Sequence, residues 1–557
     1  MEAARSIGSN WFLAGLLAIV VIGTAVRAPL LGYASNSYRL TEAINLEEAE
    51  NVRISSGMLH KSTLNPHAFE YPSLYYYACL AIEKVLSTFG RADWSAFLLG
   101  ARSLSLLFGV GAIALSGWLG LRLGNPASGL LAATLVALDR TSIQMATLAK
   151  PNSAQTFFVL AGLAALVALV ARPRVRTAML ASACFALGMA SKWLGLLGLP
   201  ALAFAGAMAT PQSGVGGMRG IFDRLRAALR HPVSPLALLL PIVVFGAVFL
   251  LCVPFALLSV REFGMGFAQV FLAQGSHRRD LPWWISLQYL AESLGPVAAI
   301  LVAVAVVWAL FRIARWRDTP RENGLLALAA WTAGYGVLVL FAFARLPSYV
   351  DLWVAPLAVL AGCAWLGPDG FLRRGGPAAA LIALVLVSGS LTNARPEMGR
   401  AGELPRDSRL LAGAWLDRHA EAEDRVIADQ GAYIPDRIGS VHWNAWGGPD
   451  RVVYDETRTW GSDERWPDWY GGHRQLLFRN ARWAAPESAL VEIAPRWVVT
   501  TSEWAHNRIS PPSHNDWIST RYDGALADGS AGFVERARFA GSPGPVILVY
   551  ERVQATP

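Results

Sequence analysis

Residues 236–258, LALLLPIVVFGAVFLLCVPFALL, form an apolar run without a single charged side chain. A helix of roughly 20 apolar residues is long enough to cross the hydrocarbon core of a bilayer. A second run, WFLAGLLAIVVIGTAV at residues 11–26, has the same character. Neither run alternates apolar with polar residues as a barrel strand does, so both predict helices that span a membrane.

The rest of the chain continues this pattern. Of its 557 residues, 54% are hydrophobic and only 16% are charged, and the mean hydropathy is +0.37. These values exclude an ordinary soluble protein and predict a polytopic α-helical membrane protein with an attached polar domain. We expect about 11 transmembrane helices, at residues 11–31, 97–121, 125–140, 153–171, 177–191, 192–210, 234–258, 286–311, 324–344, 349–366 and 377–394.

Arginine-rich loops between these spans predict the orientation of the chain. The positive-inside rule assigns such loops to the cytoplasm. The N-terminus is then cytoplasmic, everything after about residue 395 is extracytoplasmic, and the chain is a multi-pass protein of the plasma (inner) membrane. The N-terminal run has no clean small-residue cleavage site, which favours an uncleaved first helix over a signal peptide. The basic loops contain Arg122, Arg172, Arg174, Arg176, Arg219, Arg224, Arg226, Arg230, Arg312, Arg315, Arg317, Arg321, Arg373 and Arg374.

Residues 72–90, PSLYYYACLAIEKVLSTFG, are apolar enough to suggest one more span. A crossing here would move either the N-terminus or every later basic loop to the outer face, against the positive-inside rule. Glu83 and Lys84 lie inside the segment, which suits a helix lying along the membrane surface. We therefore predict that residues 33–96 form one first external loop with interfacial helices. Further external loops are expected at residues 141–152 and 259–285, the second with a surface helix.

The composition becomes polar near Arg395. We predict a transmembrane domain at residues 1–395 and an extracytoplasmic soluble α/β domain at residues 396–557. In the second part LLAGAWLDRH has helical spacing, and RVIADQ, RWVVTTS and VILVYERV are typical of short buried strands. The Trp- and Gly-rich stretch 442–473 has two interpretations: an aromatic carbohydrate-binding surface, or an irregular loop packed on the membrane domain, which we favour.

Charge and cysteine usage exclude two further classes of protein. The net charge of +8 could suggest a nucleic-acid partner, but the Arg residues gather in short loops between apolar spans and not along one helix face. We therefore expect no nucleic acid. The four Cys residues all lie in apolar segments, which predicts buried thiols and gives no support to a disulfide or metal framework.

The polar stretch from Asn45 to Tyr77, NLEEAENVRISSGMLHKSTLNPHAFEYPSLYYY, is where we expect chemistry. Charges at a membrane interface are costly unless they are paired or solvated. One interpretation is a solvated loop whose charges pair with one another. The other is a general base beside cations that hold a phosphate, because a carboxylate can take a proton from an acceptor while Arg and Lys stabilise a leaving phosphate. The cations expected on the external face are Arg39, Arg53, Lys61, Lys150, Lys192, Arg278, Arg279 and Arg345.

The acidic pair in this stretch, followed by an Arg and by NPHAFEYPSLYYY, resembles the lipid-linked-sugar glycosyltransferases of the GT-C superfamily. The resemblance is to the branch of protein O-mannosyltransferases and lipid A aminoarabinose transferases, the glycosyltransferase family 39 type. It continues over roughly residues 10–395, through ARSLSLLFGVGAIALSGWLGLRL, LAKPNSAQTFFVL, GMASKWLGLLGLP and SYVDLWVAP. A GT-C type transmembrane fold and a polyprenyl-phosphate-linked sugar as donor are what this resemblance implies.

The resemblance also assigns roles to residues. Glu47 stands where the family has an Asp as catalytic base, and Glu48 is the adjacent acid. A Glu keeps the base but moves its carboxylate by about one methylene. Asn152 stands where a second Asp is common, so a divalent cation at this site is doubtful and no cofactor is expected with certainty. His67, Tyr71, Asn152, Lys192 and Tyr349 match the family's motifs and are implied in binding donor phosphate or substrate, with Ser348 in the place where an Arg often precedes the Tyr. To these we add the external cations Arg53 and Lys150, and Arg345, which lies three residues before Ser348 and would supply the positive charge that Ser348 lacks.

Three functions remain open from the sequence. The first is an inverting transferase that moves a sugar from a polyprenyl phosphate to a glycan, lipid or protein acceptor on the outer face of the membrane. The second is a catalytically impaired relative that binds lipid-linked glycan or serves as scaffold for an envelope assembly complex, which the departures at Glu47, Asn152 and Ser348 favour. A transporter is the third, but it would carry charges within its spans and inverted symmetry.

Overall fold

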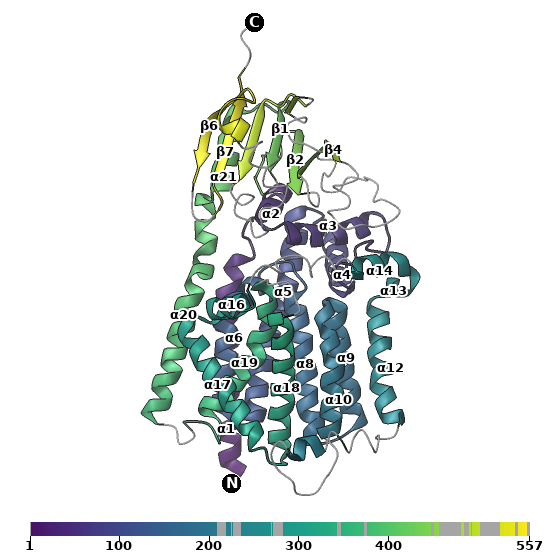
Figure 1. Ribbon diagram of the computed structural model, residues 1–557, viewed down its shortest axis with the longest axis vertical. Helices are drawn as coiled ribbons and strands as arrows, with labels where there is room; N and C mark the ends of the chain where they lie inside the picture. The colour runs from purple at the N-terminus through teal and green to yellow at the C-terminus, as the bar shows by residue number, and fades with distance from the viewer. Residues whose placement is uncertain are drawn as a thin grey trace.

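The computed structural model is a bundle of long helices with a β-sheet stacked on one end (Figure 1). The N-terminus lies at the end of the bundle that is far from the sheet. The structure describes residues 2–208, 219–223, 226, 235–268, 270, 282–341, 347–372, 376–429, 431–446, 451–455, 481–483, 490–491, 493–501, 524–540 and 544–553.

Each predicted span corresponds to a helix of the bundle. Over the described residues, six segments are long and apolar enough to cross a membrane: Asn10–Leu30, Trp94–Leu123, Asn152–Ala171, Pro296–Ala314, Pro320–Phe341 and Pro347–Leu366. Shorter apolar helices lie beside them. The bundle helices are α1 (Glu2–Arg27), α5 (Trp94–Leu123), α6 (Pro126–Leu138), α8 (Asn152–Ala171), α9 (Val175–Ser191), α10 (Gly198–Met208), α12 (Pro235–Cys252), α17 (Pro296–Ala314), α18 (Pro320–Phe341), α19 (Val350–Leu366) and α20 (Pro377–Glu403).

Two of the predicted spans are interrupted. The span expected at residues 286–311 is divided into α16 (Ile285–Leu294) and α17, because Gly295 has a positive φ of 81° and Pro296 starts the next helix. The span expected at residues 234–258 ends as α12 at Cys252, and Pro254 separates it from the short helix α13 (Phe255–Leu258). Surface helix α14 (Val260–Ala268) follows, as predicted for the external loop.

Three helices of residues 33–96, the segment predicted to be the first external loop, lie between the bundle and the sheet (Figure 1). They are α2 (Tyr38–Ile44), α3 (Leu46–His60) and α4 (Leu74–Thr88). The last of these is the segment predicted to be interfacial. Its Glu83 is buried against α3, where Ser55 Oγ donates to Glu83 Oε1 at 2.5 Å, while Lys84 is exposed.

Small residues allow the bundle helices to approach closely. A Cβ at Gly120 of α5 would lie 2.8 Å from the Cα of Gly129 in α6, and a Cβ at Gly362 of α19 would lie 2.4 Å from the carbonyl oxygen of Ser128. Of the six candidate spans, Pro347–Leu366, which contains α19, is the most deeply buried: 89% of its most apolar stretch lies inside the structure. The main apolar core runs through α5, α6, α8 and α19 and continues into α9, α10, α17 and α18.

The C-terminal region is a seven-stranded sheet in the order β4-β3-β2-β1-β5-β7-β6. Strand β1 pairs in parallel with β2 and β5, and the outer pairs are antiparallel. This confirms the predicted α/β class, and the expected helix at residues 410–419 is α21 (Ser408–His419). The strands are β1 (Arg425–Asp429), β2 (Ser440–Trp446), β3 (Arg451–Asp455), β4 (Ala481–Trp483), β5 (Trp497–Thr501), β6 (Phe533–Phe539) and β7 (Ile547–Arg552).

Two of the sequence predictions are not decided by this architecture. Helix α20 runs without a break through residue 395 towards the sheet, so the domain boundary at that residue stays a prediction (Figure 1). Of the Trp- and Gly-rich stretch 442–473, only the parts in β2 and β3 belong to the described residues. Its two interpretations therefore stay open.

Candidate functional site

An ion pair joins the first turn of α3 to the loop before α8. The Nζ of Lys150 donates to Oε2 of Glu47 at 2.6 Å, and the hydroxyl of Tyr71 donates to the other carboxylate oxygen, Oε1. Glu47 stands in the first turn because the side chain of Asn45 caps α3, accepting from the backbone N–H of Glu48 at 3.3 Å. A carboxylate near a helix N-terminus is further stabilised by the helix dipole.

A second lysine lies beside this pair. Lys192 is the residue between α9 and the short helix η2 (Trp193–Leu197), where an extended backbone ends α9. Its Nζ donates to Oδ1 of Asn152 at 3.2 Å and lies 5.2 Å and 5.4 Å from the ring centroids of Tyr71 and Tyr349. Two aromatic faces and an amide oxygen thus hold the ammonium in place.

We call Glu47, Tyr71, Lys150, Asn152, Lys192 and Tyr349 the acid–lysine cluster. Its members come from α3, the loop before α4, the start of α8, the α9–η2 junction and the start of α19. Asn152 connects two of these elements, since its Nδ2 donates to the carbonyl oxygen of Ser348 at 3.3 Å. Six of the ten predicted site residues are therefore brought together here.

The charges of the cluster shift the pKa values of its members. Burial alone would raise the pKa of Glu47, but the charges of Lys150 and Lys192 and the two hydrogen bonds hold the pKa well below its usual value. Because 41% of the Glu47 side chain is exposed, solvent screens part of this effect. Burial lowers the pKa of Lys192 to about 8, against the raising effect of the Glu47 charge. Burial and Glu47 raise the pKa of Tyr71, so that its phenol keeps the proton that it donates.

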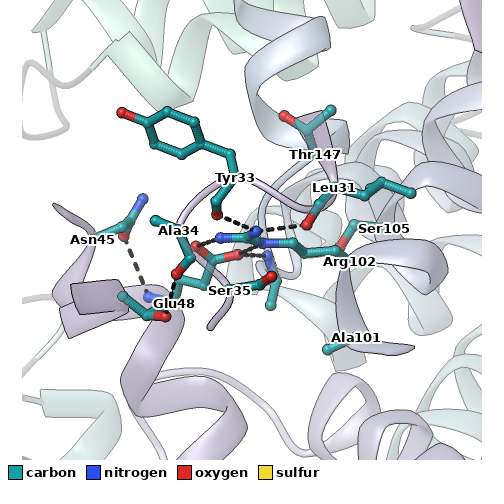
Figure 2. A network of polar contacts seen from close by, with 12 residues as sticks. Leu31, Tyr33, Ala34, Ser35, Asn45, Glu48, Ala101, Arg102, Ser105 and Thr147 are labelled. Atoms are coloured by element: carbon teal, nitrogen blue, oxygen red, sulfur yellow. Dashed lines mark hydrogen bonds and ion pairs between the residues drawn. The ribbon is translucent and has the colours of Figure 1, made fainter. Parts of the chain in front are cut away.

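The neighbouring acid, Glu48, points to a different partner (Figure 2). Its Oε1 accepts from Nε of Arg102 at 2.6 Å, and its Oε2 accepts from Nη2 of Arg102 at 2.8 Å. The Nη1 of Arg102 also donates to the carbonyl oxygens of Leu31 and Tyr33, both at 2.6 Å. Glu48 is 1% and Arg102 2% exposed, so this pair is closed to substrate.

Glu48 therefore shapes the cluster without belonging to it. Its Oε1 also accepts from the backbone N–H of Ala149 at 2.6 Å. Glu48 is next to Glu47 in the chain and Ala149 is next to Lys150, so this one carboxylate joins the two backbone segments that carry the ion pair. The bidentate contact with Arg102 in α5 then fixes both segments to the bundle.

The other predicted residues lie elsewhere. His67, in the loop before α4, contacts α14 instead: its Nδ1 lies 3.2 Å from Oε2 of Glu262. Arg53 lies in the second turn of α3 and is not a member of the acid–lysine cluster. Arg345 lies outside the described residues, so its predicted place near the phosphate stays a prediction.

Two of the buried charges that sequence reasoning missed act on the cluster or on the neighbouring Glu48. Arg102 was part of a stretch that carries the family resemblance, but no role was assigned to it. Asp351 of α19 accepts from Ser142 Oγ and Thr156 Oγ1, each at 2.9 Å, and its charge acts on Lys192. Asp351 is the single charged residue of α19, and Arg102 is the single charged residue of α5 apart from Arg122 in its last turn. This signal could have identified them, because such charges are costly unless they have a buried partner or a function.

Among the described residues, no group of three or more His, Cys, Asp or Glu side chains is arranged to hold a metal ion. The potential ligands of the acid–lysine cluster are instead a carboxylate, an amide and two phenols, with two ammonium groups between them.

Comparison with known proteins shows which proteins this chain resembles. The model of the family described as dolichyl-phosphate-mannose-protein mannosyltransferase matches residues 67–270. The crystal structure of ArnT from Cupriavidus metallidurans bound to undecaprenyl phosphate is 14% identical, with a TM-score of 0.57 over 98% of this chain and 99% of that one. No curated protein matches the chain.

A second solved structure has the same architecture. The archaeal oligosaccharyltransferase AglB from Archaeoglobus fulgidus, in complex with an inhibitory peptide and a dolichol-phosphate, is 12% identical with a TM-score of 0.51. The match covers 98% of this chain and 75% of that one. These similarities confirm the predicted fold class and the resemblance drawn from the sequence.

Proposed function

We propose that this chain, which has the fold of the GT-C glycosyltransferases, is a sugar transferase. It moves a sugar from a polyprenyl-phosphate donor to an acceptor on the outer face of the plasma membrane. The observation that carries the proposal is the acid–lysine cluster. The carboxylate of Glu47 is paired with the ammonium of Lys150, and the ammonium of Lys192 lies beside this pair, over the ring of Tyr71. That is the combination needed to take up a proton and to hold a phosphate.

The reaction follows from the roles of these groups. The hydroxyl or amine of the acceptor attacks the anomeric carbon of the sugar, and its proton passes to the carboxylate of Glu47. The bond from that carbon to the phosphate oxygen breaks, and the electron pair leaves with the phosphate. Lys150 and Lys192 offset the charge that develops there, so the products are the glycosylated acceptor, with inverted configuration, and polyprenyl phosphate.

The contacts also give an order to the steps. In the structure Lys150 is paired with Glu47, and this pairing makes the carboxylate a weak base. A donor phosphate attracts both lysines, which lowers their effect on Glu47 and raises its basicity. Glu47 therefore becomes an effective base only after the donor has bound.

The relatives support a lipid phosphate as the donor group. The ArnT structure holds undecaprenyl phosphate, and the AglB structure holds a dolichol-phosphate and a peptide. By analogy we assign the polyprenyl tail of the donor to a groove between bundle helices. We keep the orientation predicted from the basic loops, with the N-terminus cytoplasmic and residues 396–557 extracytoplasmic.

Turnover distinguishes this proposal from a binding protein. The purified full-length chain is mixed with a set of synthetic polyprenyl-phosphate sugars and with membrane extract as source of acceptor, and the release of polyprenyl phosphate is measured. The enzyme is expected to release polyprenyl phosphate from at least one donor over many turnovers. Saturable binding of donors without release throughout the set would favour the catalytically impaired relative, in which Glu47 and Asn152 are departures that removed activity.

The pH dependence of donor use is expected to report Lys192. Its ammonium is charged below its pKa of about 8 and neutral above it, so phosphate binding weakens as the pH rises through 8. We expect kcat/KM for the donor to fall by up to about tenfold per pH unit above that value. In Lys192→Arg the guanidinium stays charged, and the fall should move to much higher pH.

The matched control for this pH profile is Lys84→Arg. Lys84 is an exposed lysine of α4, and its replacement should leave the wild-type profile unchanged. An unchanged alkaline fall in Lys192→Arg would show that another group controls it.

A further inference from the structure

Helix α2 is attached to the C-terminal region by a buried arginine. The Nη1 of Arg39 donates to the carbonyl oxygens of Pro435 at 2.7 Å and Ile438 at 3.0 Å. Both carbonyls belong to the segment between β1 and β2, and Arg39 is only 7% exposed. Arg39 was one of the external cations that could have held a phosphate. Its guanidinium is instead used by these two carbonyl groups.

Further contacts surround this attachment. Ser37, which caps α2, donates through Oγ to Oδ1 of Asp436 at 3.1 Å. From the other side, Nη1 of Arg409 in α21 donates to the carbonyl oxygen of Ala43 at 3.2 Å. Leu40 of α2 is buried in a small apolar cluster with partly buried Leu404, Leu410 and Tyr433 from the C-terminal region. Helix α2 is therefore bound along its length by residues that follow the bundle.

The position of α2 is passed directly to Glu47. Only Asn45 separates α2 from α3: its backbone N–H donates to the carbonyl oxygen of Thr41 in α2, and its side chain caps α3. The first turn of a helix has no internal partners for its N–H groups, so its geometry depends on this cap. The contacts of Glu48 hold the backbone that follows Glu47. Glu47 itself belongs to the first turn of α3, whose geometry the Asn45 cap determines.

We propose that Arg39 is a positioning residue for Glu47, and that the β1–β2 segment which holds it is part of the framework of the active site. The inference rests on the proposed function for its effect on catalysis, but the docking of α2 can be measured independently. A displacement of about 1 Å between reacting groups can lower a rate by about a hundredfold. Loosening α2 should therefore reduce turnover without removing any group that binds the phosphate.

The test uses the full-length variants Arg39→Gln and Arg39→Lys in detergent. Hydrogen exchange of the backbone amides at residues 37–50 should become at least about tenfold faster in Arg39→Gln, with α8 and α19 unchanged. The kcat for sugar transfer should fall by about tenfold to a hundredfold at an almost constant KM for the donor. Arg39→Lys should recover part of both effects, since an ammonium can reach one of the two carbonyls.

Arg418→Gln is the matched control. It removes an exposed arginine of α21 whose Nε donates to the carbonyl oxygen of Ala414 in the same helix, so both measurements should stay at wild-type values. Unchanged exchange at residues 37–50 in Arg39→Gln would overturn the docking role. Faster exchange with an unchanged kcat would overturn the positioning role. If the wild type transfers no sugar, the proposed function fails, and the exchange data still decide whether Arg39 orders the first turn of α3.

If Arg39→Gln does not fold, Ser37→Ala provides a second variant of the same contact. It removes the hydrogen bond to Asp436 and the side-chain cap of α2 and leaves every charge in place. Faster exchange at residues 37–50 together with a lower kcat supports the inference. Wild-type exchange or a wild-type kcat in a folded Ser37→Ala protein contradicts it.

Discussion

Glu47→Gln is expected to lower the rate of sugar transfer by about a hundredfold to ten-thousandfold, the usual contribution of a general base. An amide has almost the same shape as the carboxylate, so it keeps the contact with Tyr71, but it cannot accept a proton from the acceptor. The donor should still bind, because Lys150 and Lys192 remain. The measurement is a comparison of kcat for polyprenyl phosphate release with the affinity for undecaprenyl phosphate, each for the wild type and the variant.

Two variants control this experiment. Glu47→Asp keeps a carboxylate with a shorter side chain and should retain far more activity than Glu47→Gln. Glu292→Gln makes the same chemical change at an exposed site on α16, and it should behave as the wild type. Wild-type turnover in Glu47→Gln, with the protein folded, would remove Glu47 as the base.

The largest effect on stability is expected at Arg102. Arg102→Met leaves the carboxylate of Glu48 buried without its ionic partner, and it also removes the hydrogen bonds to the carbonyl oxygens of Leu31 and Tyr33. Breaking a buried ion pair in this way typically costs about 3–5 kcal/mol of the free energy of unfolding. Thermal or denaturant unfolding in detergent should show a correspondingly large loss, whereas Arg418→Met at the exposed site on α21 should show little change.

The double variant Glu48→Met/Arg102→Met separates the ion pair from the other contacts. With both charges removed, no unpaired charge stays buried, so the double variant should be more stable than Arg102→Met alone. Its kcat should still be low, because Ala149 has lost the acceptor that holds Lys150 near Glu47. Additive losses of stability in the double variant would show that the two side chains are not coupled.

Most of the fold could be predicted from the apolar runs, because a bilayer sets both the length and the composition of a spanning helix. The parity of the basic loops further indicated that residues 72–90 do not form a span of the bundle, and α4 lies at the sheet end with α2 and α3. The break at Gly295 was not predicted. The apolar pattern continues on both sides of it, and only the backbone conformation of one glycine separates α16 from α17.

The acid–lysine cluster was predicted in part. The family resemblance identified Glu47 and Lys192, and Lys150 was one of the cations expected on the external face; the structure brings these three residues together. The different surroundings of Glu47 and Glu48 follow from helix geometry, since consecutive residues do not share a face of a helix. Which of the two acids meets the buried Arg102 depends on the packing of α3 against α5. That packing is set by contacts distant in the sequence, and local patterns do not reveal it.

The most direct measurement is a cryo-EM structure of the full-length Glu47→Gln variant with an unreacted polyprenyl-phosphate sugar. We expect the phosphate to lie within hydrogen-bond distance of both Lys150 and Lys192, with the anomeric carbon of the sugar facing residue 47 and the lipid tail between bundle helices. A phosphate bound away from these two lysines, with the Lys150 side chain still directed at residue 47, would contradict the proposed roles of Glu47 and the two lysines.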